Sequence, residues 1–315
     1  MPEARYRYAL PQLGDAIFLT DGGLETTLIF QDGFELPHFA AFDLLASERG
    51  RRGLRTYYER YAAMARSNRL GLVLESPTWR ANIDWASRLG YDRARLADAN
   101  REAIALMVEV RDAFATQAAP MVISGNIGPR GDGYDPGRPM SAEQAEAYHA
   151  EQVSTFADTA ADMVAAVTMT NVEEAVGVTR AAVAARMPVA ISFTVETDGR
   201  LPTGQSLADA VLTVDRETGA APAYYMLNCA HPTHFDAILD DAPWTRRLRG
   251  LRANASSKSH AELDAAPELD PGDPVEFGRQ YRALRQKVRG LTILGGCCGT
   301  DHRHIEQIRL ACIAA

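Results

Sequence analysis

The side chains with the clearest chemical potential are two adjacent cysteines near the C-terminus, Cys297 and Cys298. They stand in the glycine-rich segment 295–300, after the apolar run 291–294. The chain of 315 residues contains only four cysteines, which are too few for a disulfide framework. Adjacent thiols after a strand-like run therefore indicate metal binding or thiol chemistry. Cys312, by contrast, lies in an apolar run and is predicted to be a small core residue.

A third cysteine, Cys229, follows another strand-like run. In a parallel barrel all strands end at the same rim, so Cys229 would meet Cys297 and Cys298 there. Three thiolates with one open coordination position suit a catalytic zinc ion, which prefers tetrahedral coordination. We therefore predict these three cysteines as metal ligands and as the catalytic residues. His231 and His234 offer a competing Cys-x-His-x-x-His ligand set.

Eight strand-like apolar runs must position these residues, and segments of helical composition, such as 141–148 and 172–180, separate most of them. The runs are 16–20, 71–75, 121–124, 163–167, 189–193, 224–227, 248–251 and 291–294. Strands that alternate with helices imply parallel βαβ units. Eight units in about 300 residues predict an α/β fold, a (β/α)8 TIM barrel that forms a single domain over 1–315.

An open, doubly wound sheet is the structural alternative to the barrel. No Gly-x-Gly-x-x-Gly turn follows the first strand, however, so nothing favours a dinucleotide-binding fold. The longest irregular stretches, 125–140 and 254–274, follow the third and seventh predicted strands. In a barrel, loops after strands build the active face.

Composition narrows the possible partners. Hydrophobic residues make up 46% of the chain, which argues for a large core. The formal net charge is −8, which argues against a nucleic-acid-binding surface. No apolar run approaches the roughly 20 residues that span a bilayer, and the first residues lack the apolar stretch of a secretory signal. We therefore expect a cytoplasmic protein with small-molecule partners and no membrane or nucleic-acid partner. A homo-oligomer remains possible.

Four motifs together resemble the homocysteine S-methyltransferase family. They are Asp21-Gly22-Gly23-Leu24-Glu25-Thr26, Gly125-Asn126-Ile127-Gly128-Pro129, Asn228-Cys229 with Pro232, and Gly295-Gly296-Cys297-Cys298-Gly299-Thr300. The resemblance spans nearly the whole chain. It implies a zinc-dependent (β/α)8 barrel that methylates the thiol of homocysteine to form methionine, with Cys229, Cys297 and Cys298 as the ligands of the Zn2+ cofactor.

The methyl donor implied by this resemblance is a soluble cation. The chain is too short to add cobalamin-binding and folate-binding domains, so we expect S-methylmethionine, S-adenosylmethionine or a betaine-like compound. The sulfonium or ammonium group of such a donor would pass its methyl group to a thiolate held by zinc, since a zinc-bound thiol is deprotonated.

Polar residues at the predicted rim are candidates for substrate binding. They are Asp21, Gly22, Gly23, Glu25, Thr26, Glu75, Ser124, Asn126, Asn228 and Asn254. The carboxylates of Asp21 and Glu25 could hold a substrate ammonium group or a cationic donor. Backbone amides of the turn that begins at Gly125 could bind a substrate carboxylate.

One position departs from the family pattern. Many members carry a glutamate after the fourth strand that helps to hold the amino group of homocysteine, and Val167 stands there in this chain. Glu75 could supply the missing carboxylate. Thiol methylation is therefore more firmly indicated than homocysteine as the acceptor.

Two other functions stay open from the sequence. The barrel could act on another thiol or demethylate a quaternary amine, which Trp79, Trp85 and Tyr134 could hold in an aromatic cage. It could also be a non-catalytic zinc-binding barrel, in which a fourth protein ligand such as His231 would close the metal site.

Overall fold

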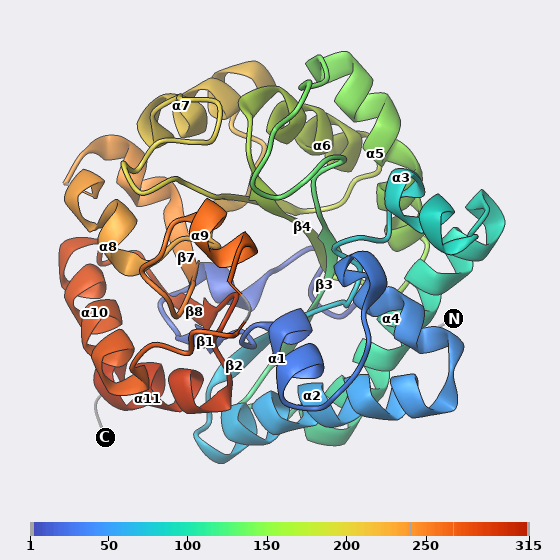
Figure 1. Cartoon of the computed structure of the whole chain (residues 1–315), viewed down its shortest axis with the longest axis horizontal. Coiled ribbons are helices and arrows are strands. Elements are labelled where there is room, and N and C mark those ends of the chain that lie inside the picture. Colours follow the sequence, from blue (N-terminus) through green and yellow to red (C-terminus); the bar gives the residue numbers. More distant parts are fainter. Residues whose placement is uncertain (1–2, 240, 267, 314–315) are drawn as a thin grey trace.

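Eight parallel strands close into a barrel in the computed structural model, which describes residues 3–239, 241–266 and 268–313. The strands are β1 Phe18–Leu19, β2 Gly71–Glu75, β3 Met121–Ile127, β4 Met163–Met169, β5 Val189–Phe193, β6 Tyr224–Asn228, β7 Leu248–Ala253 and β8 Ile293–Gly296. Each strand pairs with the next along the chain, and β8 pairs with β1 (Figure 1). The predicted (β/α)8 barrel is confirmed, and the open sheet is excluded.

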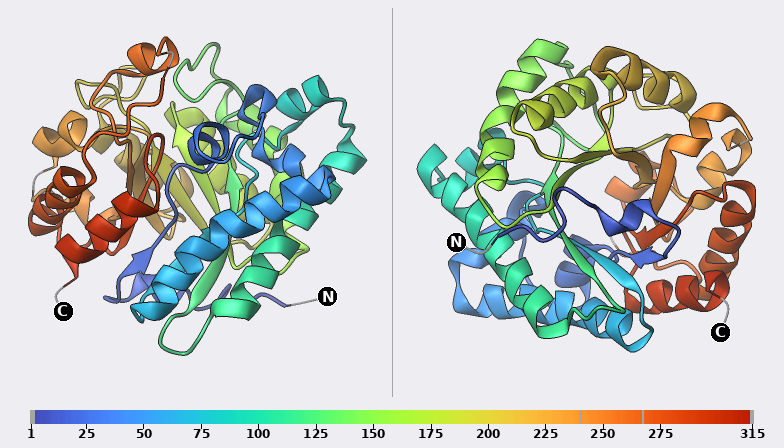
Figure 2. Two further views of the ribbon diagram at one scale, coloured as in Figure 1. Left: turned by 60° about the horizontal axis from the view of Figure 1, so that its bottom comes forward. Right: turned by 180° about the vertical axis from the view of Figure 1, so that it is seen from behind.

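Helices cover the outside of the barrel (Figure 1). The longer ones are α2 Glu48–Ser67, α4 Arg93–Phe114, α5 Ala142–Ala157, α6 Val172–Ala184, α7 Leu207–Thr218, α10 Pro274–Lys287 and α11 His302–Cys312. The shorter ones are α1 Leu24–Phe30, α3 Ile83–Ala86, α8 Pro232–Phe235 and α9 His260–Asp264. The left view of Figure 2 shows α1, in blue, and α9, in orange, at one end of the barrel. No helix in the described part of the chain is long and apolar enough to cross a membrane.

The two helices predicted from composition begin where polar caps stand. Ser141 accepts a hydrogen bond from the backbone N–H of Gln144 and completes a capping box at the start of α5. Asn171 caps α6 in the same way, through the N–H of Glu174. The predicted segments 141–148 and 172–180 are therefore the first turns of longer helices.

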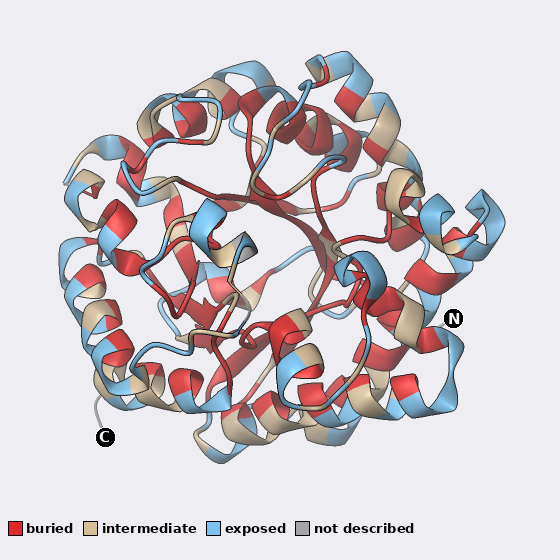
Figure 3. Ribbon diagram, viewed as in Figure 1, coloured by how far each residue is buried: buried red, intermediate tan, exposed pale blue. Residues whose placement is uncertain are grey.

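Alternation along the strands separates two cores. Val73, Val122, Val167 and Met226 belong to a cluster of side chains that fill the inside of the barrel, and Leu10 joins them. Residues of the opposite parity pack against the surrounding helices in a larger cluster. Buried residues accordingly follow the strands and the inner faces of the helices (Figure 3). The apolar filling leaves the strand ends free for polar side chains.

Five strands, β3, β4, β6, β7 and β8, extend beyond their predicted ends, and in β3 and β8 the extension contains glycine. β3 runs on through Gly125 to Ile127, and β8 ends at Gly296, although both glycine-containing segments were predicted as turns. A Cβ atom on Gly295 would lie 1.8 Å from Thr20 Oγ1, and one on Gly296 would lie 2.1 Å from Thr300 Oγ1. These glycines therefore let β8 pack closely against neighbouring segments.

Gly23 controls a further close approach, between the loop after β1 and the thiol turn. A Cβ atom there would lie 2.5 Å from the carbonyl oxygen of Cys297. Since the φ angle of Gly23 is −74°, alanine is excluded by this contact and not by the backbone conformation. We expect Gly23→Ala to lower the free energy of unfolding by about 1–3 kcal/mol in urea denaturation. Gly14→Ala is the control, because Gly14 has a similar φ of −77° and a Cβ atom there would meet only Pro11 O, at 3.5 Å. Equal losses in both variants would contradict this explanation.

Candidate active site

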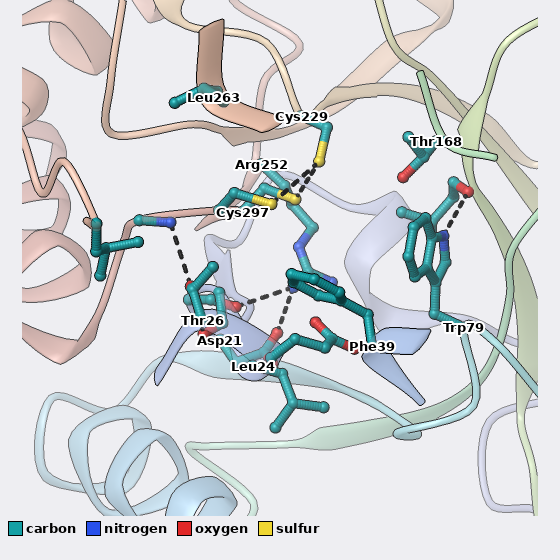
Figure 4. Close-up of a pocket in the computed structure, with 18 of the residues that line it drawn as sticks. Asp21, Leu24, Thr26, Phe39, Trp79, Thr168, Cys229, Arg252, Leu263 and Cys297 are labelled. Atoms are coloured by element: carbon teal, nitrogen blue, oxygen red, sulfur yellow. Dashed lines mark hydrogen bonds and ion pairs between the residues drawn. The ribbon is translucent and has the colours of Figure 1, made fainter. Parts of the chain in front are cut away.

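The three predicted thiols converge at the C-terminal rim of the barrel. Cys229 Sγ lies 2.7 Å from Cys297 Sγ and 3.7 Å from Cys298 Sγ, and all three sulfur atoms lie within 4.8 Å of one another. In the described part of the chain this is the only cluster of histidine, cysteine or acidic side chains with metal-site spacing. Figure 4 shows the sulfur atoms of Cys229 and Cys297 facing each other, joined by a dashed line.

Cys229 is held in a conformation that side-chain-bearing residues rarely adopt. Its φ is +56°, in the left-handed region. Its carbonyl oxygen accepts hydrogen bonds from His260 Nε2 at 2.7 Å, Asn254 Nδ2 at 3.0 Å and Thr194 Oγ1 at 3.4 Å. Its own N–H donates to Arg252 O at 3.1 Å. These bonds offset the backbone strain and keep the thiol turned toward Cys297.

Tyr134 adds a hydroxyl group to the thiol cluster. Its Oη lies 3.7 Å from Cys229 Sγ and 3.6 Å from Cys298 Sγ, and its ring stacks on His260 at 4.0 Å. Hydrogen bonds from Cys229 and Cys297, with a contribution from Tyr134, lower the pKa of the Cys298 thiol. The pKa of Cys229 is raised by its hydrogen bonds with the other two thiols and by burial. Cys298 is thus the first of the three to ionise in the metal-free protein.

A buried arginine organises the floor of the site. Arg252, near the end of β7, pairs with Asp21 at 2.7 Å and with Glu75, and its Nε donates to Gly296 O at 3.1 Å. Burial raises the pKa of Asp21, and the guanidinium of Arg252 acts against this rise. The arginine therefore joins the loop after β1 and the end of β2 to the end of β8, which directly precedes Cys297.

The thiols form part of the wall of a cavity of about 420 Å³. Its lining comes from the loops after β1, β2, β3, β6, β7 and β8 and from the end of β4. The described lining includes six carboxylates and two guanidiniums. The cavity is therefore large enough for two small substrates and carries an excess of negative charge.

The predicted substrate-binding residues fall into two groups. Those that line the cavity are Asp21, Gly22, Gly23, Glu25, Thr26, Glu75 and Asn126. Ser124, Asn228 and Asn254 lie outside its lining. Asn228 accepts from Thr168 N and Ser192 Oγ within the barrel, and Asn254 supports the Cys229 carbonyl, so both serve the framework of the site. Ser124 is fully buried on β3.

Several lining residues have roles that their motifs did not reveal. Thr26 Oγ1 accepts from Gly299 N at 3.2 Å, and Gly23 N donates to Thr300 O at 3.0 Å, so α1 is fastened to the thiol turn. Glu75, proposed as a substitute acid, is paired with Arg252. Asn126 N donates to Ser76 Oγ at 3.0 Å, so this amide of the β3 segment is already engaged.

Arg80 covers the aromatic rings that the sequence suggested as a cation cage. Its guanidinium lies 4.2 Å from the centre of the Trp79 ring and 3.8 Å from that of Trp85, and it also pairs with Asp132 at 3.1 Å. Figure 4 shows Trp79 donating from its indole nitrogen to a backbone carbonyl, that of Val167. The three-residue cage for a quaternary amine is therefore not formed.

The histidine alternatives lie apart from the thiols. His231 is the N-cap of α8 and its Nδ1 lies 2.8 Å from Thr233 Oγ1, and His234 Nε2 lies 3.0 Å from Ser257 O. Burial lowers the pKa of His231 to about 4, which fits a neutral capping ring. Neither histidine joins the cysteine cluster. The structure therefore gives no support to the Cys-x-His-x-x-His ligand set or to His231 as a closing fourth ligand.

Arg252 is the main residue that sequence reasoning missed. A signal was present, because an arginine directly after the strand-like run 248–251 must find carboxylates if it points into a barrel. Asp21 and Glu75 also follow strands, so the three charges were available as a set. Tyr57, which donates to Asp21 at 3.0 Å, carried no such signal.

Removal of the central arginine should destabilise the fold. We expect Arg252→Met to lower the free energy of unfolding by about 3–5 kcal/mol at pH 7.5, because two buried carboxylates lose their counter-charge. The loss should shrink as the pH falls and the carboxylates take up protons. Urea denaturation measures both effects. Arg249→Met, at a half-buried position near the start of the same strand, is the control, and an equally large loss there would contradict the importance of the ion cluster.

Glu25 should give the metal-free protein a pH-dependent stability. Burial, with a further contribution from Cys297, raises the pKa of this carboxyl from 4.5 to about 7. A raised pKa destabilises the folded state as the pH rises through that value, so Glu25→Gln should gain stability over wild type between pH 5 and pH 8, by at most about 3 kcal/mol. Thermal unfolding at both pH values measures this gain. Glu173→Gln is the control, since Glu173 occupies the same helix position in α6 and is exposed. A difference that does not change with pH would refute the assignment.

Comparisons with known proteins identify the family of this chain. A sequence profile described as "Homocysteine S-methyltransferase" matches residues 18–312. The oxidized form of the homocysteine methyltransferase MmuM from Escherichia coli is 21% identical and has a TM-score of 0.74, with coverage of 97% of this chain and 99% of that one. Its metallated form is 20% identical, also with a TM-score of 0.74, and the coverage is 96% and 98%. No curated protein sequence matches. This chain is a methyltransferase and belongs to the homocysteine S-methyltransferase family.

Proposed function

We propose that this protein is a zinc-dependent S-methyltransferase that moves a methyl group from a soluble sulfonium or ammonium donor to the thiol of homocysteine. The observation that carries the proposal is the convergence of three thiols on the wall of a negatively charged cavity. Family membership supports homocysteine as the acceptor.

The donor set fits a zinc ion. Zinc–sulfur bonds of about 2.3 Å at tetrahedral angles place sulfur atoms about 3.8 Å apart. Cys229 and Cys298 already have this spacing, at 3.7 Å, and Cys297 would move away from Cys229 by about 1 Å to match it. Cys229, Cys297 and Cys298 would hold the ion and leave its fourth position to the cavity. Bound there, zinc would keep the substrate thiol ionised at neutral pH.

The charge of the cavity favours a cationic methyl donor. Arg252 is neutralised by Asp21 and Glu75, and Arg80 by Asp132, so the arginines leave the cavity with no free positive charge in its described lining. A sulfonium ion would be attracted to such a site, and its charge disappears when the methyl group leaves. Since Arg80 covers the tryptophan rings, we favour a sulfonium donor over a quaternary amine.

The chemical step is a direct displacement. The thiolate sulfur of the acceptor attacks the methyl carbon and forms the new S–C bond. The S–C bond of the donor breaks, and its electron pair stays on the donor sulfur, so that two neutral thioethers result. The protein binds both substrates with sulfur and methyl carbon in line and excludes water from the cavity.

Methyl transfer can be tested directly. We expect the zinc-loaded protein to convert homocysteine and S-methylmethionine or S-adenosylmethionine to methionine, as detected by mass spectrometry. Cys298→Ser should reduce bound zinc and lower the rate at least about 100-fold, because a ligand thiolate is lost. Cys312→Ser is the control, since Cys312 lies in α11, outside the cavity lining.

Two results would contradict the proposal. If the protein with one equivalent of zinc methylated no thiol with any of the donors, the catalytic assignment would fail. If Cys298→Ser retained full activity and full zinc content, the thiol cluster would not be the metal centre.

A further inference from the structure

One carboxylate in the cavity has no charged partner although it lies partly buried. Glu25 lines the cavity from the first turn of α1 and forms no ion pair with any described residue. A desolvated carboxylate without a counter-charge is costly, and the cost is removed when a cation with hydrogen-bond donors arrives. The lack of a partner is thus a reason to look for a ligand group at Glu25.

The other carboxylates of the described lining are already engaged or exposed. Asp21 and Glu75 bind Arg252, and Asp132 binds Arg80. Asp270 accepts from Ser256 Oγ at 2.8 Å and Gly272 N at 3.1 Å and lies 3.5 Å from Lys258 Nζ, and Glu268 is exposed. Glu25 is therefore the carboxylate in this cavity that is both partly buried and free to accept a substrate cation.

The fold fixes Glu25 relative to the thiols. Thr26, the next residue, accepts a hydrogen bond from Gly299, and Gly23 donates to Thr300, so the first turn of α1 and the Cys297–Gly299 turn form one unit. Glu25 and Cys297 are also close enough to interact electrostatically. A substrate whose sulfur lies at the thiol cluster would thus have its remaining atoms close to this carboxylate.

We propose that Glu25 binds the α-ammonium group of the acceptor thiol and thereby selects an amino acid over a simple thiol. The inference rests on the proposed thiol methylation and goes further, by naming the residue that recognises the acceptor. In homocysteine three carbon atoms separate sulfur from nitrogen, so an acceptor with its sulfur at the cysteines presents its ammonium group within the same cavity. Val167, on β4, offers only an apolar surface to that cavity.

The test compares homocysteine with 4-sulfanylbutanoate, which lacks only the amino group. Binding of each thiol is measured on the cobalt(II)-substituted protein by its thiolate-to-metal absorption, so the readout does not depend on turnover. Wild type should bind homocysteine about 10- to 100-fold more tightly, which is the contribution of one charge-assisted hydrogen bond. Glu25→Gln should lose this preference and bind 4-sulfanylbutanoate with an affinity within about 2-fold of that of wild type.

A matched control separates recognition from a general effect of charge. Glu173→Gln removes a glutamate from the same helix position in α6, far along the chain from the thiols and outside the cavity lining. This variant should keep the full preference for homocysteine. Urea denaturation of Glu25→Gln verifies that the variant is folded.

The remaining outcomes each overturn a defined claim. If Glu25→Gln kept the wild-type preference for homocysteine, the assignment of Glu25 would be wrong while thiol methylation stood. If Glu25→Gln weakened both thiols equally, Glu25 would not recognise the ammonium group. If wild type bound no thiol at its metal, the proposed function itself would fail, and this inference with it.

Discussion

The site depends on one buried ion cluster, in which Arg252 holds Asp21 and Glu75 together. The same guanidinium reaches Gly296 O, the last residue of β8 before the cysteine pair. The loop after β1 and the ends of β2 and β8, which come together only in the closed barrel, are thereby fixed to one planar group. Arginine suits this task, because its rigid fork of donors can bind two carboxylates and a carbonyl at once. The positions of Cys297 and Cys298 follow from this arrangement.

The cluster also determines the electrostatics of the cavity. Because Arg252 is saturated by its own carboxylates, its charge does not extend to the substrate space. Arg80 is engaged in the same way by Asp132 and lies over the two tryptophan rings. The guanidinium groups of Arg80 and Arg252 thus form part of the cavity wall. The charges that have no partner in the described lining are negative. A cavity of this kind attracts a cationic donor and provides a place for an ammonium group, whereas it repels anions.

The sequence predicted the barrel well because eight apolar runs and their spacing report burial directly, and it located Cys229, Cys297 and Cys298 because each stands after a strand. It failed where a role depends on tertiary partners. Glu75 and Asn254 look like free polar rim residues in the sequence, but Arg252 and the Cys229 carbonyl engage them. The close contacts of Gly295 with Thr20 and of Gly296 with Thr300 likewise depend on packing that the sequence does not reveal. The position of a residue relative to a predicted strand indicates the end of the barrel at which the residue lies. Its contacts depend on the packing of the folded chain.

Some features of the site lower the stability of the fold, and these features are concentrated near the thiols. Cys229 has a left-handed backbone that three hydrogen bonds to its carbonyl must maintain, and Glu25 remains partly buried with its pKa raised to about 7. A barrel filled with apolar side chains can tolerate such costs, which are each of order 1–3 kcal/mol. Neither feature improves packing. Ligand binding in the cavity would explain both features, since a metal ion would neutralise the thiolates and a substrate cation would neutralise Glu25. The backbone strain at Cys229 and the unpaired charge of Glu25 are therefore best explained as features that favour ligand binding at the C-terminal ends of the strands.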